Sequence, residues 1–175
     1  MRIFLVGYMG SGKSRWGKMI ANHYGLRFID LDTHIEEREG ITIPEIFAKY
    51  NEEGFREREK RALQSIGDID NVIIATGGGA PCFNNNMQEM NSLGETLYIE
   101  GTPELLRDRI TSSKTERPLV KNYSQDELLE YIQNHLNSRK PFYEQAKYKI
   151  VTGDLELENF IQILDPIINS LNQQV

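Results

Sequence analysis

Short apolar runs alternate along the chain with longer segments in which apolar residues recur at helical spacing. This alternation is typical of βαβ units around a parallel sheet, because strands covered on both faces are apolar at nearly every position. The chain is therefore predicted to adopt an α/β fold with three layers, in which helices cover both faces of a five-stranded parallel sheet. The predicted strands are Ile3–Val6, Arg27–Asp30, Val72–Ala75, Thr96–Ile99 and Lys149–Val151.

Two segments are longer than this alternation requires. Residues 32–62 are charged and helical in pattern, although one crossover helix would connect the second and third strands, so we expect an inserted substrate-binding region there. Residues 111–123 are polar and contain Pro118, and a loop of this length is typical of a lid or of a disordered segment. Because no linker or repeat divides the chain, we interpret residues 1–175 as one domain.

Composition excludes several classes of protein. The chain has 20 Lys+Arg against 26 Asp+Glu, a formal net charge of −6, and lacks the basic runs that neutralise nucleic-acid phosphates. It contains no apolar stretch near the roughly 18 residues that a membrane-spanning helix needs. Cys82 has no second cysteine to pair with, which favours a reducing compartment. We expect a monomeric cytoplasmic protein with no nucleic-acid or membrane partner.

The segment Gly7–Ser14 matches the pattern G-x-x-x-x-G-K-[ST] between a predicted strand and a predicted helix. In this motif the glycines let backbone N–H groups turn toward phosphate oxygens, and the next helix directs its positive end to the same point. The lysine reaches the β- and γ-phosphates, and the hydroxyl binds Mg²⁺. We therefore expect a nucleoside triphosphate site, made by Gly10, Ser11, Gly12, Lys13 and Ser14.

Two carboxylates, Asp30 and Asp32, follow the second strand. In an extended chain this spacing places both on one face, at the sheet edge where the phosphate loop also opens. One could then hold Mg²⁺ through water, while the other accepts a proton from an attacking hydroxyl. The alternative is that Asp32 only caps the next helix and that Asp30 is solvated.

Three consecutive glycines, Gly77–Gly79, follow the third strand. They cost conformational entropy and are favoured where the backbone must approach another group closely. Many P-loop proteins place an aspartate here to hold Mg²⁺, and this chain has none. We interpret the segment as backbone that contacts a substrate, with Asp30 supplying the acid, and the alternative is an ordinary flexible turn.

Several arginines are candidate anion-binding residues, because a guanidinium binds a carboxylate in bidentate fashion and stabilises a transferring phosphoryl group. Any one of them taken alone is more often a solvated surface charge, which is the alternative. These arginines are Arg56, Arg107, Arg109, Arg117 and Arg139. We interpret the mixed charges at 36–39 and 57–61 as solvent-exposed helix faces. The histidines lack ligand spacing and are assigned no chemistry: His23, His34 and His135.

Taken in order, these elements resemble the shikimate kinase family from Ile3 to about Val151. The matching elements are Gly7–Ser14, Asp30 with Asp32, Phe55 with Arg56, Thr76–Gly79, Arg117–Leu119, and Arg139 with Pro141 and Tyr143. The resemblance implies a P-loop kinase fold with a lid. It also implies phosphoryl transfer from MgATP to the 3-hydroxyl of shikimate, a step toward chorismate and the aromatic amino acids.

The resemblance assigns roles on the acceptor side of the site. It implies that Asp32 binds the reacting hydroxyl and acts as the catalytic base. Asp30 would support Mg²⁺ through water, alongside Ser14. Arg56 and Arg139 would bind the carboxylate of shikimate.

On the nucleotide side, the resemblance implies that Arg117 joins Lys13 in neutralising phosphate charge when the lid closes. Arg109 looks like the family's adenine-stacking arginine. On the acceptor side, the backbone of Gly77–Gly79, chiefly at Gly78, would contact the ring hydroxyls of shikimate. Arg15 stands where the family commonly has threonine, and we expect it to alter local contacts with phosphate.

Other functions remain open at this stage. The acceptor could be another small molecule, such as gluconate, which also carries a carboxylate, or a nucleoside monophosphate. A nucleotide-binding switch of the GTPase kind is a further alternative, although the guanine-specific Asn-Lys-x-Asp motif is absent. Because ATP and shikimate, the two substrates that the resemblance implies, are both anions, the net charge of −6 must coexist with a locally cationic cleft.

Overall fold

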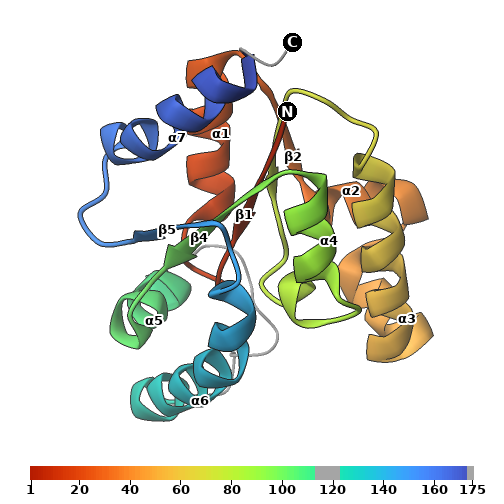
Figure 1. The fold of residues 1–175 in the computed structure, drawn as a ribbon. Helices are drawn as coiled ribbons and strands as arrows, with labels where there is room; N and C mark the ends of the chain where they lie inside the picture. Colours follow the sequence, from red (N-terminus) through yellow and green to blue (C-terminus); the bar gives the residue numbers. More distant parts are fainter. Residues whose placement is uncertain (113–122, 173–175) are drawn as a thin grey trace.

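A five-stranded parallel sheet forms the centre of the computed structural model, which describes residues 1–112 and 123–172 (Figure 1). The strand order is β2-β3-β1-β4-β5. Every predicted strand is present, and each end lies within one residue of its prediction, which confirms the fold class. The strands are β1 (Arg2–Val6), β2 (Arg27–Asp30), β3 (Val72–Ala75), β4 (Glu95–Glu100) and β5 (Tyr148–Val151).

Helices cover both faces of the sheet (Figure 1). Helices α1 and α7 contact each other on one face, and α3, α4 and α6 lie on the other side. The helices are α1 (Lys13–Tyr24), α2 (Leu31–Glu39), α3 (Ile43–Ile66), the short 3₁₀ helix η1 (Ala80–Cys82), α4 (Asn86–Leu93), α5 (Pro103–Ser112), α6 (Gln125–Tyr143) and α7 (Leu157–Asn172).

The central strand β1 contributes side chains to two separate cores. Ile3 and Leu5 pack with residues of α1 and α7, whereas Phe4 and Val6 belong to the core under α3, α4 and α6. All four side chains are fully buried. Because successive strand residues point to opposite faces, one apolar run supplies both cores. The carboxyl end of β1 is thereby held rigidly at the point where the phosphate loop begins.

The charged insertion at residues 32–62 is helical, as predicted, and forms most of α2 and α3. Helix α3 changes direction at Asn51, whose φ of 56° is not helical. The side-chain oxygen of Asn51 accepts a hydrogen bond from the backbone N–H of Gly54 at 3.2 Å, so the second half of α3 starts with its own cap. That second half carries Arg56 toward the interior of the molecule.

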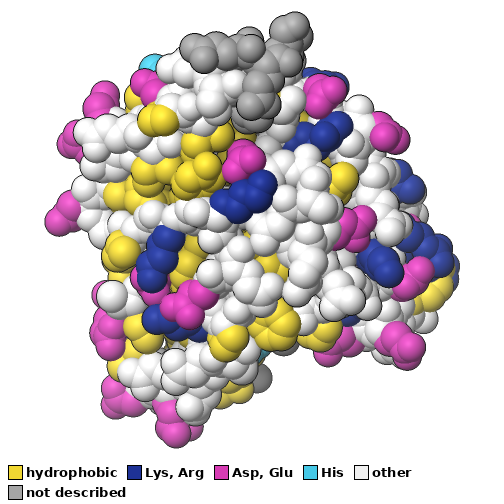
Figure 2. Space-filling model, in the orientation of Figure 1, with side chains coloured by type: hydrophobic (Ala, Val, Ile, Leu, Met, Phe, Trp, Pro, Cys, Tyr) yellow, Lys and Arg dark blue, Asp and Glu magenta, His cyan; other side chains and the backbone are white. Residues whose placement is uncertain are grey.

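The surface carries both signs of charge. On the face drawn in Figure 2, Lys and Arg side chains are interspersed with Asp and Glu side chains. None of the helices in the described part of the chain is both long enough and apolar enough to cross a membrane. The expected lid at residues 111–123 lies almost wholly outside the described residues.

Candidate active site

The phosphate loop joins the end of β1 to the start of α1. Gly10 and Gly12 have φ angles of 83° and 94°, in the left-handed region where a side chain would be strained. Lys13 is only 7% exposed, and its ammonium donates hydrogen bonds to the carbonyls of Gly7 at 2.8 Å and Tyr8 at 2.9 Å. The loop therefore wraps around a buried cation at the N-terminus of a helix, an arrangement suited to binding phosphate.

Ser14 and Asp30, the two predicted metal ligands, lie together. The Ser14 hydroxyl donates a hydrogen bond to Oδ2 of Asp30 at 2.6 Å. These two oxygens fit Mg²⁺, which binds oxygen ligands and keeps several waters beside substrate phosphates. Within residues 1–112 and 123–172, no cluster of three or more His, Cys, Asp or Glu side chains could hold a metal ion.

The chain around Asp32 is not extended, so the spacing argument for Asp30 and Asp32 is wrong. Strand β2 ends at Asp30, and helix α2 begins at Leu31. Asp30 caps this helix by accepting the Asp32 backbone N–H at 3.2 Å, so the alternative in which Asp32 is the cap is also wrong. The helical turn nevertheless leaves both carboxylates at the carboxyl edge of the sheet, as predicted.

The environment of Asp32 makes its carboxyl group unusually basic. Burial, followed by the neighbouring charge of Asp30, raises the pKa of Asp32 to about 6, against the lowering effect of Lys13. A carboxylate with a pKa closer to neutrality is a better proton acceptor and is still mostly ionised at pH 7. The site therefore contains a group suited to general-base chemistry.

The glycine turn faces three different side chains. A Cβ at Gly77 would lie 2.7 Å from Oδ1 of Asp32, and a Cβ at Gly79 would lie 2.7 Å from a guanidinium nitrogen of Arg56. A Cβ at Gly78 would lie 3.7 Å from a guanidinium nitrogen of Arg139. The backbone of this turn thus lies close to Asp32 and Arg56, because no side chain fits beside either one without displacing it. Its predicted contact with a substrate stays a prediction.

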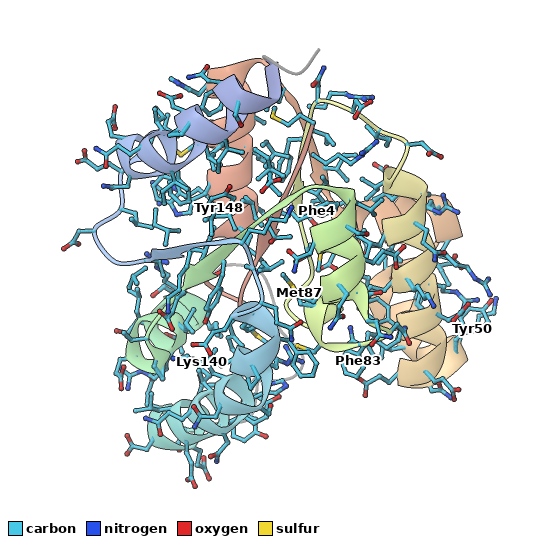
Figure 3. All side chains as sticks on the ribbon, viewed as in Figure 1. Phe4, Tyr50, Phe83, Met87, Lys140 and Tyr148 are labelled. Carbon is cyan, nitrogen blue, oxygen red and sulfur yellow. The ribbon has the colours of Figure 1, made fainter. Side chains whose placement is uncertain are left out.

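Arg56 is held by carboxylates and aromatic rings. Its guanidinium donates hydrogen bonds to Glu59 at 2.8 Å and to Glu52 at 3.3 Å. It also lies 4.0 Å from the ring centroid of Phe83, which Figure 3 labels in the turn before α4. Because these contacts hold the cation from several sides, its position near Gly79 is well defined.

Glu59 is a site residue that sequence reasoning missed. The side chain is 1% exposed, so the interpretation of residues 57–61 as a solvent-exposed face is wrong at this position. Burial raises the pKa of Glu59 to about 7, although the adjacent Arg56 lowers it. The only sequence signal is that Glu59 stands three residues after Arg56, a spacing that pairs side chains on a helix.

The other candidate arginines fall in different places. Arg109 donates to the Thr152 hydroxyl at 2.9 Å and to the Gly10 carbonyl at 3.4 Å, so it connects α5 with the phosphate loop and the end of β5. Arg107 instead pairs with its neighbour Asp108 at 2.7 Å.

Arg15 and Arg117 complete the predicted nucleotide side. The Arg15 guanidinium lies 5.2 Å from the ring centroid of Trp16. Arg117 lies outside the described residues.

Helix α6 contributes two further contacts, one from Tyr143, which belongs to a matching element of the sequence, and one from His135. The Tyr143 hydroxyl donates to the Gly78 carbonyl at 2.5 Å. The Tyr8 hydroxyl and Nδ1 of His135 lie 3.0 Å apart, although no chemistry was assigned to this histidine. The sequence feature that could have pointed to His135 is its helical spacing, because Arg139 follows four residues later on the same face of the helix.

A phosphate loop, a buried basic carboxylate and two arginines at one glycine turn define a P-loop phosphotransferase that acts on a small anionic acceptor. The sequence model of the family described as shikimate kinase matches residues 9–171. A shikimate kinase of Bacteroides fragilis is 43% identical over 173 residues, which is 97% of each chain. The chain thus belongs to the shikimate kinase family, and its activity is the ATP-dependent phosphorylation of shikimate.

Solved structures of relatives have the same fold. Shikimate kinase from Bacteroides thetaiotaomicron matches with a TM-score of 0.89 at 40% identity, covering 97% of this chain and 98% of that chain. Shikimate kinase from Acinetobacter baumannii, in complex with shikimate, matches with a TM-score of 0.82 at 35% identity, covering 97% and 93%. A gluconokinase from Sinorhizobium meliloti, at 17% identity and a TM-score of 0.58, shares the fold alone.

Proposed function

We propose that the protein transfers the γ-phosphoryl group of MgATP specifically to the 3-hydroxyl of shikimate, with Asp32 as the base. The observation that carries this proposal is the meeting of Asp32, Arg56 and Arg139 at the glycine turn. One proton acceptor and two carboxylate-binding cations match an acceptor that has both a hydroxyl and a carboxylate.

In this proposal the carboxylate of shikimate binds Arg56 and Arg139. Glu59 and Phe83 keep the Arg56 guanidinium oriented, and the remaining N–H groups can face the substrate. The backbone of Gly77–Gly79 bonds the ring hydroxyls, since it lies beside all three functional side chains. These contacts set the distance from the carboxylate to the reacting hydroxyl, which favours shikimate over gluconate.

The chemical step follows from the positions of the charged groups. The 3-hydroxyl oxygen bonds to the γ-phosphorus, the bond from that phosphorus to the β-phosphate oxygen breaks, and the hydroxyl proton passes to Asp32. Lys13 stabilises the negative charge that develops on the phosphates. Mg²⁺, supported by Ser14 and through water by Asp30, would supply further charge neutralisation.

The remaining nucleotide contacts belong to the same proposal. Arg109 stacks on the adenine, which its position beside Gly10 and Thr152 supports. Arg15 adjusts the contacts of the loop with phosphate. Arg117, outside the described residues, neutralises phosphate charge together with Lys13.

A panel of acceptors tests the proposal. The purified protein is incubated with MgATP and shikimate, gluconate or a nucleoside monophosphate, and ADP formation is followed together with the phosphorus NMR spectrum of the product. We expect turnover with shikimate and a phosphate ester at its 3-position. Turnover on gluconate without turnover on shikimate would assign the rival acceptor. Equal affinity for GTP and ATP with no acceptor-dependent turnover would support the nucleotide switch instead.

A further inference from the structure

Helix α6 presents two polar side chains to the same tyrosine of the phosphate loop. His135 and Arg139 are four residues apart, so both lie on one face of the helix. The His135 ring meets the Tyr8 ring edge to face, with ring centroids 5.6 Å apart. The Arg139 guanidinium lies 5.8 Å from the centroid of the same tyrosine ring. Tyr8 therefore connects the phosphate loop with the part of α6 that carries Arg139.

Tyr8 also holds the phosphate loop itself together, through its backbone. Its carbonyl accepts hydrogen bonds from the Lys13 ammonium at 2.9 Å and from the Ser11 backbone N–H at 3.2 Å. One residue thus contacts the phosphate-binding lysine through its backbone and α6 through its side chain. A change at the hydroxyl leaves both backbone contacts in place.

The hydrogen bond between Tyr8 and His135 is partly buried, and its tyrosine side is the more deeply buried. Tyr8 is 1% exposed, and a buried hydroxyl that loses its partner costs free energy. Burial, followed by the positive charge of Arg139, lowers the pKa of His135, while Glu52 of α3 opposes this effect. A neutral imidazole can accept the hydroxyl proton at Nδ1, across the separation of 3.0 Å, when its own proton is on Nε2.

We propose that Tyr8 and His135 are positioning residues that hold α6, and with it Arg139, in place against the phosphate loop. This inference depends on the carboxylate-binding role proposed above for Arg139. Small displacements of a binding group weaken a bidentate contact strongly. Loss of the pair therefore raises the KM for shikimate, while the KM for ATP changes little because the loop keeps its backbone bonds.

Steady-state kinetics of four variants and one control variant test this positioning role. Tyr8→Phe and His135→Leu are each expected to raise the KM for shikimate by about three- to tenfold, the typical worth of one intramolecular hydrogen bond. The double variant should match the single variants, since each removes the same contact. His135→Asn keeps a side-chain oxygen near the Nδ1 position and should restore most of the affinity. Tyr131→Phe, which removes another hydroxyl from α6, is the matched control and should leave both KM values unchanged.

Arg139→Ala, measured in parallel, separates failure of this inference from failure of the proposed function. If Arg139→Ala raises the KM for shikimate and the Tyr8 and His135 variants do not, the positioning role is wrong. If Arg139→Ala has no effect, the carboxylate site is misplaced and the role of the pair as positioning residues falls with it. Additive effects of Tyr8→Phe and His135→Leu would show that the two side chains do not act through one shared contact, which would likewise overturn the inference.

A measurement on the unmodified protein keeps the inference testable if a variant does not fold. Imidazole nitrogen-15 NMR distinguishes the two neutral tautomers of His135 and reports a hydrogen bond accepted at Nδ1. We expect the proton on Nε2 and an Nδ1 signal shifted, relative to a neutral imidazole in water, by an accepted hydrogen bond. A proton on Nδ1 in the neutral ring, or an Nδ1 signal without that shift, would overturn the proposed contact.

Discussion

Replacing Asp32 with asparagine separates the chemistry of the site from its stability. Asparagine has nearly the same shape and stays neutral at every pH. Burial raises the pKa of Asp32 from 3.8 to about 6 in the folded protein, so ionisation opposes folding. That difference in pKa corresponds to about 3 kcal/mol at most, because one pKa unit is worth about 1.4 kcal/mol. The variant is therefore expected to be more stable than the unmodified protein, by up to that amount at pH 8.

The gain in stability should depend on pH in a definite direction. A carboxyl group whose pKa is higher in the folded state binds its proton more tightly there, so this group's contribution to stability falls as pH rises. The fall begins near 3.8 and is complete above about 6. The asparagine side chain would not titrate, so the advantage of Asp32→Asn should be about half as large at pH 5 as at pH 8.

Urea unfolding at these two pH values measures the effect. The fluorescence of Trp16, the single tryptophan, which is 5% exposed, can report unfolding. Glu37→Gln is the control, because it removes an exposed charge from the same helix and should change stability by less than about 0.5 kcal/mol. A variant that is no more stable at pH 8, or whose gain is the same at both pH values, would refute the account of Asp32 as a buried, destabilised carboxylate.

The same variant should lose most of its activity. Removal of a general base lowers kcat by about 10²- to 10⁴-fold, while ATP binding stays nearly unchanged because no phosphate contact is lost. In the unmodified protein, kcat/KM should fall about tenfold per pH unit below about pH 6, as Asp32 becomes protonated. A profile that stays flat down to pH 5 would show that Asp32 is not the base.

Three other substitutions test the surroundings of the base. Gly79→Ala places a Cβ 2.7 Å from the Arg56 guanidinium and should raise the KM for shikimate at least several-fold, with unchanged ATP binding measured by calorimetry. Arg139→Ala should cost on the order of 2 to 4 kcal/mol of shikimate affinity, and an unchanged KM would contradict the carboxylate site. Tyr143→Phe removes the hydrogen bond to the Gly78 carbonyl and should lower the free energy of unfolding by about 1 kcal/mol; equal urea midpoints would contradict this.

The strands and the phosphate loop could be predicted because their signals are local. A strand such as Val72–Ala75 is buried on both faces, so its residues are apolar without interruption. The loop Gly7–Ser14 requires glycines at φ angles that other residues avoid, and it keeps a fixed spacing to its lysine. In both cases the physical requirement falls on consecutive residues.

The errors arose where residue spacing alone does not determine which groups meet in the folded chain. Glu59 has the charge and spacing of a surface residue, yet it is buried, with Arg56 paired to it and the glycine turn of another segment beside it. At Asp32, the start of the helix depends on whether Asp30 accepts the backbone N–H, which residue spacing does not reveal. The contact between Tyr8 and His135 joins residues 127 positions apart, a distance over which periodicity carries no information.

The glycine turn has a consequence for the evolution of resistance to inhibitors. A compound that bonds mainly to the backbone of Gly77–Gly79 would contact atoms that every amino acid shares, so no exchange of side chains removes its hydrogen bonds. The usual escape, a larger side chain that blocks the compound, would first collide with Asp32 at one end of the turn or with Arg56 at the other. Mutations that exclude such a compound at this turn would therefore also disturb the residues proposed to handle the substrate, and resistance would have to arise elsewhere in the pocket.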